Sequence, residues 1–353
     1  MEKKQYTPAA ILKKILKFIL FFGVGIFFIY LSIKDLTTED VQMLKESAAE
    51  VKKGSAWIFL AVSLVIGAFS HYFRALRSVL LLEPLNYKVR KSMSFFAVMV
   101  CYLANLAFPR LGEVLRCTFL QQYEKVPFQK SLGTVVTERA IDLILLLIVV
   151  GVAILLNTNI LYELKVGDTT LGEGFSQKIV GMLHNYTLYY LLAGMILLIV
   201  IIYVTRKKWN KIHFFVKIKD FFIGIWQGLI SIKDLKHPIL FVIYSLMIWV
   251  CYFLGTYFCF FAFDFLSGLG ITVVFSCFAF GLIGFVVGPG GLGAYPLIIA
   301  GTLVLYGVDY NAGLAAGWVG WGVQTLMVIV FGIISLIAAS FMKRTANEVS
   351  SND

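Results

Sequence analysis

The sequence predicts an all-α polytopic membrane protein with about six full spans and two re-entrant helical hairpins that enter from opposite sides. Of its 353 residues, 59% are hydrophobic and 14% are charged, a balance that water-soluble domains do not show. Apolar segments recur along the chain, most of them near the roughly 20 residues that a helix needs to cross hydrocarbon. Two of these stretches are interrupted by proline and glycine, which predicts the hairpins.

The apolar segments form one membrane domain, residues 11–342, between short cytoplasmic tails at 1–10 and 343–353. They lie at residues 18–33, 56–73, 92–108, 141–156, 187–205, 238–263, 269–288, 292–306 and 312–341. Lysines before the first segment imitate a signal peptide, but no small-residue cleavage site follows it. We therefore expect an anchor helix there.

The net charge of +11 raises the question of a nucleic-acid partner, but the distribution of charge points to membrane topology instead. Of the 31 Lys and Arg, 25 fall in segments that alternate with the predicted spans, namely 1–17, 74–91, 110–139, 205–237 and 342–353. Cytoplasmic loops carry such an excess. We therefore expect a membrane protein with both termini in the cytoplasm and no nucleic-acid partner.

Two basic regions have simple interpretations on this topology. Arg74 and Arg77, one turn apart after the second segment, are interpreted as inner-leaflet anchors. Residues 206–237 interleave lysines with aromatic and aliphatic side chains, which predicts an interfacial helix on the inner leaflet.

The first hairpin is predicted from a helix that is too short to span. The apolar segment 92–108 is followed by an apolar stretch of only about ten residues, 111–120, which holds Glu113 and Arg116, and ten residues cannot cross a bilayer. Pro109 breaks the helix and Gly112 relieves crowding at the turn. A re-entrant hairpin satisfies the charge topology, provided that protein or a water-filled cavity supports its tip.

The second hairpin is predicted from a glycine-rich break without charge. Residues 269–306 are interrupted at Gly288, Pro289 and Gly293, and no charged residue occurs between Asp264 and Asp309. A cytoplasmic turn without Lys or Arg would contradict the rest of the chain, so we expect a hairpin that enters from outside. Two full spans in place of this hairpin would leave the flanking loops on the same sides of the membrane, so that alternative stays open. Hairpins from opposite faces are typical of inverted-repeat transporters.

Three charged residues follow the first break at three-residue spacing: Arg110, Glu113 and Arg116. On a helix they lie along one side, where guanidinium groups can bind phosphate oxygens and the carboxylate can hold an arginine or a headgroup amine. The alternative is that they lie at the level of the inner headgroups, as many flanking residues do.

A second charged group, Glu138, Arg139 and Asp142, opens the next span. Helix capping alone could explain Glu138, because the helix dipole favours negative charge at an N-terminus. Asp142 lies deeper. We expect either a salt bridge from this span to the hairpin arginines or a proton or ion relay.

The glycine turn offers a third candidate site. Backbone N–H groups of Gly290 and Gly291 could bind an anionic headgroup, although glycines equally serve close helix packing. The four histidines are scattered and the five cysteines show neither CxxC spacing nor extracellular pairs. We therefore expect no metal site, no cofactor and no disulfide.

Taken together, Asn105, the run PRLGEVLR at 109–116, ERAIDL at 138–143 and PGGLG at 289–293 resemble the lysylphosphatidylglycerol synthase transmembrane (flippase-like) family. The resemblance implies a domain that moves a phospholipid between leaflets, in some members fused to a soluble aminoacyl-transferring domain. We expect a stand-alone member whose cargo need not be aminoacylated, and the resemblance implies a location in the bacterial cytoplasmic (inner) membrane. Pro296 stands where the resemblance implies an acidic residue, which argues against a cation or proton role for the second hairpin.

We therefore expect a lipid flippase that uses a polar cavity between the hairpins, with no catalytic residue. Its expected partners are membrane phospholipids with anionic or zwitterionic headgroups, and a homo-oligomer is left open. The expected substrate-binding residues are Asn105, Arg110, Glu113, Arg116, Gly290 and Gly291. No P-loop is present to supply nucleotide energy.

Two other classes of protein remain open. A membrane-embedded glycosyltransferase acting on a polyprenyl phosphate could use the acid pair Glu39 and Asp40, although that loop is short and mixed in charge. An accessory membrane subunit would depend on neither charged group.

Overall fold

The structure is a computed structural model that describes residues 42, 56–107, 110–157, 165–166, 169–170, 233–287 and 289–350. Its helices are α3 Ala56–Leu82, η1 Glu83–Leu85, α4 Lys91–Ala107, α5 Leu111–Glu124, α6 Phe128–Leu156, α11 Pro238–Phe260, α12 Asp264–Ser267, α13 Ile271–Val287, η2 Pro289–Gly291, α14 Ala294–Val304 and α15 Tyr310–Ser350. Two short antiparallel strands, β1 Lys165–Val166 and β2 Thr169–Thr170, complete the described elements. Apart from these strands, every described element is helical, as predicted.

Four described helices are long and apolar enough to cross a membrane: α3 with η1, α6, α11 and residues Tyr310–Met342 of α15. They correspond to the predicted spans at 56–73, 141–156, 238–263 and 312–341. The predicted spans 18–33 and 187–205, and most of the predicted interfacial helix at 206–237, lie outside the described residues. These four apolar helices identify an integral membrane protein.

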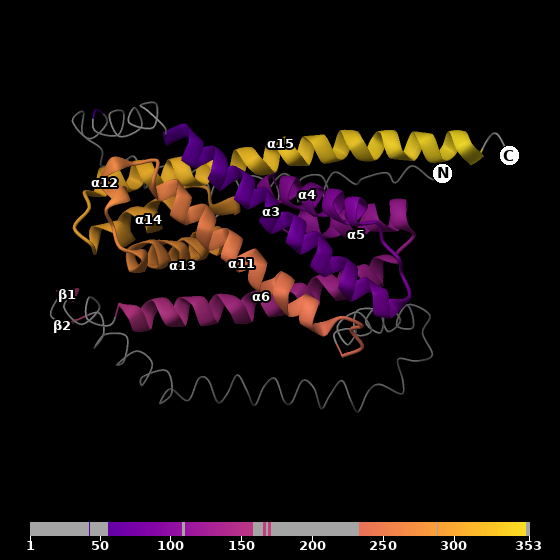
Figure 1. Cartoon of the computed structure of the whole chain (residues 1–353), viewed down its shortest axis with the longest axis horizontal. Coiled ribbons are helices and arrows are strands. Elements are labelled where there is room, and N and C mark those ends of the chain that lie inside the picture. The colour runs from indigo at the N-terminus through magenta and orange to yellow at the C-terminus, as the bar shows by residue number, and fades with distance from the viewer. Residues whose placement is uncertain are drawn as a thin grey trace, which may run out of the picture.

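Two pairs of shorter helices form hairpins that open at opposite ends of the molecule, α4 with α5 and α13 with α14 (Figure 1). At 1.5 Å per residue, α5 is roughly 21 Å long and α14 roughly 16 Å, both less than the roughly 30 Å of hydrocarbon. The two tips meet, because η2 packs against α4 and a Cβ on Gly290 would lie 3.3 Å from Leu106 Cδ2.

Glycines allow the two arms of each hairpin to approach closely. A Cβ on Gly112 would lie 2.0 Å from the backbone oxygen of Cys101, so α5 can contact α4 only where residue 112 lacks a side chain. A Cβ on Gly284 would similarly lie 2.7 Å from Tyr295 Cα. The predicted role of Gly112 in relieving crowding is confirmed, whereas Pro109 and Gly288 lie outside the described residues.

Two helices extend further than the sequence predicted. Helix α3 continues past the predicted end at residue 73 as far as Leu82, and α6 begins at Phe128 instead of residue 141. A short turn separates α5 from α6. It contains Lys125, which has a positive φ of 58°, and Pro127. Arg74, Arg77 and Glu138, which the sequence predicts at helix ends, therefore lie inside helices.

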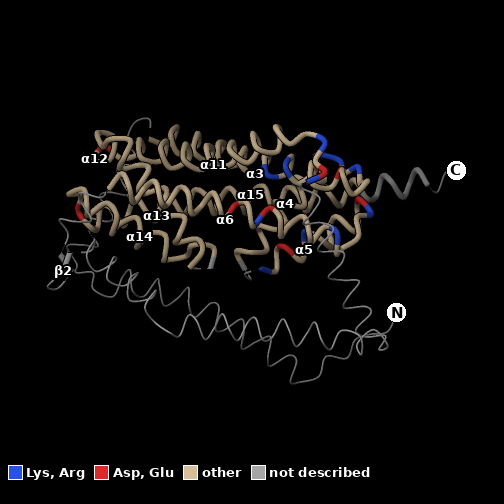
Figure 2. Tube along the Cα trace, turned by 90° about the horizontal axis from the view of Figure 1, so that it is seen from below, with Lys and Arg blue, Asp and Glu red and all other residues tan. Residues whose placement is uncertain are grey.

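Charge is distributed unequally along the long axis. Lys and Arg gather at the end of the described chain where the α4–α5 hairpin opens, while the end that carries α12 shows acidic residues (Figure 2). A further group of charged residues lies in the middle, between the two ends.

Candidate functional site

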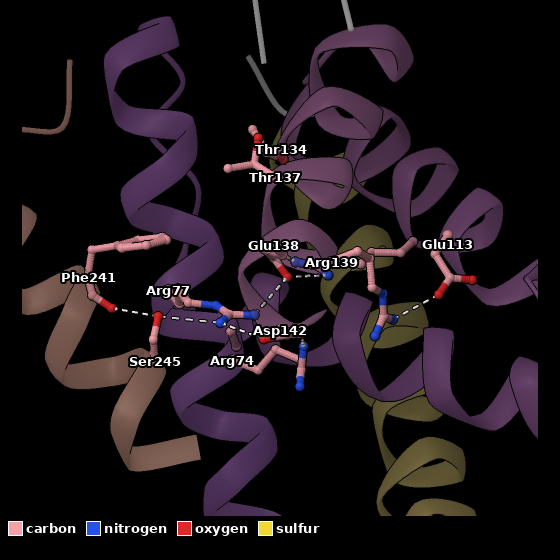
Figure 3. Close-up of polar contacts among 12 residues, drawn as sticks. Arg74, Arg77, Glu113, Thr134, Thr137, Glu138, Arg139, Asp142, Phe241 and Ser245 are labelled. Carbon is pink, nitrogen blue, oxygen red and sulfur yellow. Dashed lines mark hydrogen bonds and ion pairs between the residues drawn. The ribbon is translucent and has the colours of Figure 1, made fainter. Parts of the chain in front are cut away.

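The charged residues inside the helices form two adjoining groups. The buried network consists of Arg74, Arg77, Arg116, Glu138 and Asp142, and the tip group consists of Asn105, Arg110, Glu113 and Arg139. Helices α3, α4, α5 and α6 supply these side chains, except for Arg110, which immediately precedes α5. Figure 3 shows that the α3 and α6 members point toward one another across the gap between their helices.

Arg116 joins the first hairpin to α6 through a bidentate ion pair. Its Nη1 and Nη2 donate to the two carboxylate oxygens of Glu138, at 3.0 and 2.7 Å, and Glu138 is 1% exposed. Such paired, parallel hydrogen bonds fix geometry as well as adding energy. The structure therefore contains the expected salt bridge from this span to a hairpin arginine.

Helix α3 joins the same network at Asp142. Arg74 Nη1 lies 2.5 Å from Asp142 Oδ2, and Arg77 Nη1 lies 2.8 Å from Oδ1. Arg77 Nη2 also lies 3.9 Å from Glu138 Oε2, so this fully buried guanidinium lies between two carboxylates one helical turn apart. These contacts tie α3 to α6 (Figure 3).

The interpretation of Arg74 and Arg77 as inner-leaflet anchors is therefore wrong. Both side chains are buried and ion-paired with α6, and α3 runs on past them through the apolar residues Val79–Leu82. Arg74 lies eight residues before Leu82, roughly 12 Å along the helix. That apolar run after the arginines is the sequence signal that could have placed them within the span.

Capping does not explain Glu138 either. It lies ten residues after the first residue of α6, so its carboxylate is far from the helix N-terminus, and the capping interpretation is wrong. The salt bridge to Arg116 accounts for its burial instead.

Helix α11 adds neutral partners that sequence reasoning missed. Arg74 Nη2 donates to the Tyr252 hydroxyl at 3.0 Å, and Arg77 Nη1 lies 3.4 Å from Ser245 Oγ. Single Ser and Tyr residues within apolar spans carry no distinctive pattern, so only tertiary packing reveals them.

The tip group is held by hydrogen bonds around Glu113. Arg139 Nη2 donates to Glu113 Oε1 at 2.8 Å, and Asn105 Nδ2 lies 3.4 Å from Oε2. Asn105 Oδ1 accepts the backbone N–H of Gly112 at 2.9 Å. Asn105, a predicted substrate-binding residue, thus also fastens α5 to α4 at the break.

Arg110 differs from every other arginine of the two groups. It is exposed, it precedes α5 with a positive φ of 63°, and it forms no ion pair among the described residues. A left-handed backbone at a residue other than glycine costs about 1–3 kcal/mol, and such strain clusters at functional sites. Arg110, Glu113 and Arg116 therefore do not form one continuous clamp, because Arg116 is buried against Glu138 while Arg110 is exposed.

The second hairpin presents backbone instead of charge. Gly290, Gly291 and Gly293 have φ values of 59°, 77° and 70°, which only glycine adopts without strain. The backbone oxygen of Gly290 accepts a hydrogen bond of 2.9 Å from Trp321 Nε1 on α15. Binding of a headgroup by Gly290 and Gly291 stays a prediction.

Pro296 is part of the packing of this hairpin. It lies buried in α14, where a Cβ on Gly317 of α15 would come within 2.6 Å of its Cα. The position at which the resemblance implied an acidic residue is therefore a close helix contact in this chain.

A neutral hydrogen-bond ring fastens the second hairpin to the other end of α6. Asn157 Nδ2 donates to Ser276 Oγ of α13 at 2.7 Å, and the Tyr306 hydroxyl bonds both Asn157 Oδ1 and Ser276 Oγ. Helix α6 thus contacts both hairpins, one through ion pairs and one through neutral groups.

Comparison with known proteins identifies the family. The sequence matches the family described as the lysylphosphatidylglycerol synthase TM region over residues 14–332. No curated protein and no solved structure matches the chain significantly. The family match indicates a function connected with membrane lipids. Since it covers most of the 353 residues, this chain belongs to the lysylphosphatidylglycerol synthase transmembrane-region family.

Proposed function

We propose that this protein moves a phospholipid between the two leaflets of the cytoplasmic membrane. The observation that carries the proposal is the meeting of two hairpin tips, one charged and one built of glycine, between apolar helices. A polar headgroup crosses hydrocarbon slowly because it loses its hydrogen bonds with water. Fixed charges and backbone groups between the tips would replace those bonds while the acyl chains stay in lipid.

The helix lengths support re-entrance of both hairpins. If the end of α5 at Glu124 lies at one hydrocarbon boundary, Arg110 lies roughly 20 Å inside it, about two-thirds of the way across the hydrocarbon. Helix α14, roughly 16 Å long, would bring the glycine turn to the same region from the other side. The basic end of the molecule would face the cytoplasm under the positive-inside rule.

In this proposal the two charged groups have different roles. Arg110 binds the lipid phosphate, and Glu113 with Arg139 completes the polar wall of the site. The buried network holds the first hairpin against α6 and α3. The rival enzyme depends on Glu39 and Asp40, which lie outside the described residues, and no observation favours it.

The test is movement of a fluorescent phospholipid in vesicles that contain the purified protein, read out by quenching of the outer leaflet. We expect Arg110→Ala to abolish protein-dependent movement because it removes the phosphate contact. Lys88→Ala, which removes an exposed cation away from the hairpin tips, should leave movement unchanged.

Equal melting temperatures in detergent would show that both variants are folded. Movement by Arg110→Ala at the rate of the parent protein would overturn the assignment of Arg110.

A further inference from the structure

The charged residues between the hairpins carry more positive than negative charge. Among the described residues, the buried network and the tip group contain five arginines and three carboxylates, a formal excess of two positive charges. The residues are Arg74, Arg77, Arg110, Arg116 and Arg139 against Glu113, Glu138 and Asp142. Uncompensated charge in a low-dielectric region is costly, so the site favours an anion.

Most of this charge is already committed to partners within the protein. Glu138 engages Arg116 with both oxygens, and Asp142 engages Arg74 and Arg77. These side chains are between 0% and 15% exposed, so the buried network offers a ligand little access.

The accessible charge lies in the tip group. The side chains of Arg139 and Glu113 are 40% and 21% exposed and pair with each other. Arg110 is exposed and has no ionic partner in the described part of the chain. The accessible side chains, Arg110, Arg139 and Glu113, therefore carry one more positive charge than negative charge.

The second hairpin brings no counter-charge to this cation. No Asp, Glu, Lys or Arg occurs between Asp264 and Asp309, and the glycine turn that meets α4 offers backbone groups. Trp321, which bonds Gly290, contributes only a neutral N–H donor. A ligand between the tips therefore has to supply the missing negative charge itself.

We propose that the headgroup site selects lipids with a net negative phosphodiester headgroup over zwitterionic and cationic ones, with the phosphate on Arg110. This inference rests on the proposed function and specifies its cargo by charge. A phosphodiester without an amine brings one negative charge and matches the single accessible excess. An added ammonium group cancels that charge, and Glu113, already bonded to Arg139 and Asn105, is poorly placed to receive it.

The experiment measures lipid binding to the delipidated protein in detergent by native mass spectrometry. Phosphatidylglycerol and phosphatidylethanolamine with identical acyl chains are supplied at equal concentration. We expect an excess of bound phosphatidylglycerol of at least about tenfold, because the ammonium of phosphatidylethanolamine is repelled by the excess guanidinium in a region of reduced dielectric, whereas phosphatidylglycerol has no such group.

Three variants test whether Arg110 and its charge set this preference. Arg110→Gln should reduce the ratio toward one, whereas Arg110→Lys, which keeps the charge, should retain most of it. Glu113→Gln should keep or increase the ratio, because it removes the only accessible carboxylate of the tip group. A parent protein that binds both lipids equally, or an unchanged ratio in Arg110→Gln, would overturn the proposal.

A further experiment distinguishes binding of a lipid from binding of a free phosphate compound. Glycerol 3-phosphate at the same concentration should leave bound phosphatidylglycerol undiminished, because the acyl chains contribute to binding; displacement would overturn the lipid assignment. Binding is measured without vesicles, so selective binding with no lipid movement would refute only the proposed function. Equal transport of both lipids in vesicles would refute only the charge selection.

Discussion

The two hairpins have similar shapes and opposite chemistry. Each consists of two short helices packed closely at glycines, and each is fastened to α6. The first carries charged residues that pair with α6, whereas the second has none and is held by the ring of Asn157, Ser276 and Tyr306. Among the described residues, the charged side chains near the contact between the tips therefore come from the first hairpin and its neighbours, and none comes from the second hairpin.

A neutral second tip has a physical advantage. If both tips carried opposite charges, they would pair with each other in the apolar interior and leave nothing for a ligand. A glycine turn permits close backbone approach without competing for Arg110. If the proposed function holds, recognition of the headgroup belongs to the first hairpin, and the second contributes close packing.

The largest expected effect comes from breaking the ion pairs of the first hairpin. Glu138→Ala leaves Arg116 without its bidentate partner and Arg77 with one carboxylate fewer. Removing one partner of a buried pair typically costs about 3–5 kcal/mol, so we expect a large loss in the free energy of unfolding. Denaturant unfolding in detergent micelles measures it.

The matched control is Arg90→Ala, because the Arg90 side chain is 53% exposed and the backbone N–H of residue 90 still donates to Glu124 after the change. Pairs with solvent access are worth about 0–1 kcal/mol. Equal losses in the two variants would show that the buried network does not stabilise the hairpin more than a surface pair does.

The next effect tests the glycines that let hairpin arms pack. Gly112→Ala should destabilise the protein by about 1–3 kcal/mol or more, because the new Cβ meets the backbone oxygen of Cys101, which cannot rotate away. Gly151→Ala in α6 is the control, since no atom of the described residues lies within 4 Å of a Cβ added there and alanine favours the helix. Thermal unfolding should rank the control above Gly112→Ala, and a reversed order would contradict the close contact.

The sequence predicted features that follow from local chemistry. Length and apolarity located the four described spans, and Gly112 and the glycine turn located the two breaks. It could not predict the pairing of Arg77 with Asp142, because 65 residues separate them and tertiary packing chooses the partner. The start of α6 was misplaced because its first turns precede the apolar run that marks the span.

The sequence did not predict the neutral ring for a related reason, since Asn, Ser and Tyr near span ends are common. Breaking this ring gives the smallest expected effect. Tyr306→Phe removes the hydroxyl that bonds Asn157 and Ser276 while keeping the aromatic packing. A neutral hydrogen bond contributes about 0.5–1.5 kcal/mol, so the loss in unfolding free energy should be well below that of Glu138→Ala. Asn157 and Ser276 still bond each other in this variant, which limits the loss further. A loss equal to that of Glu138→Ala would show that the neutral attachment holds its hairpin as firmly as the ionic one.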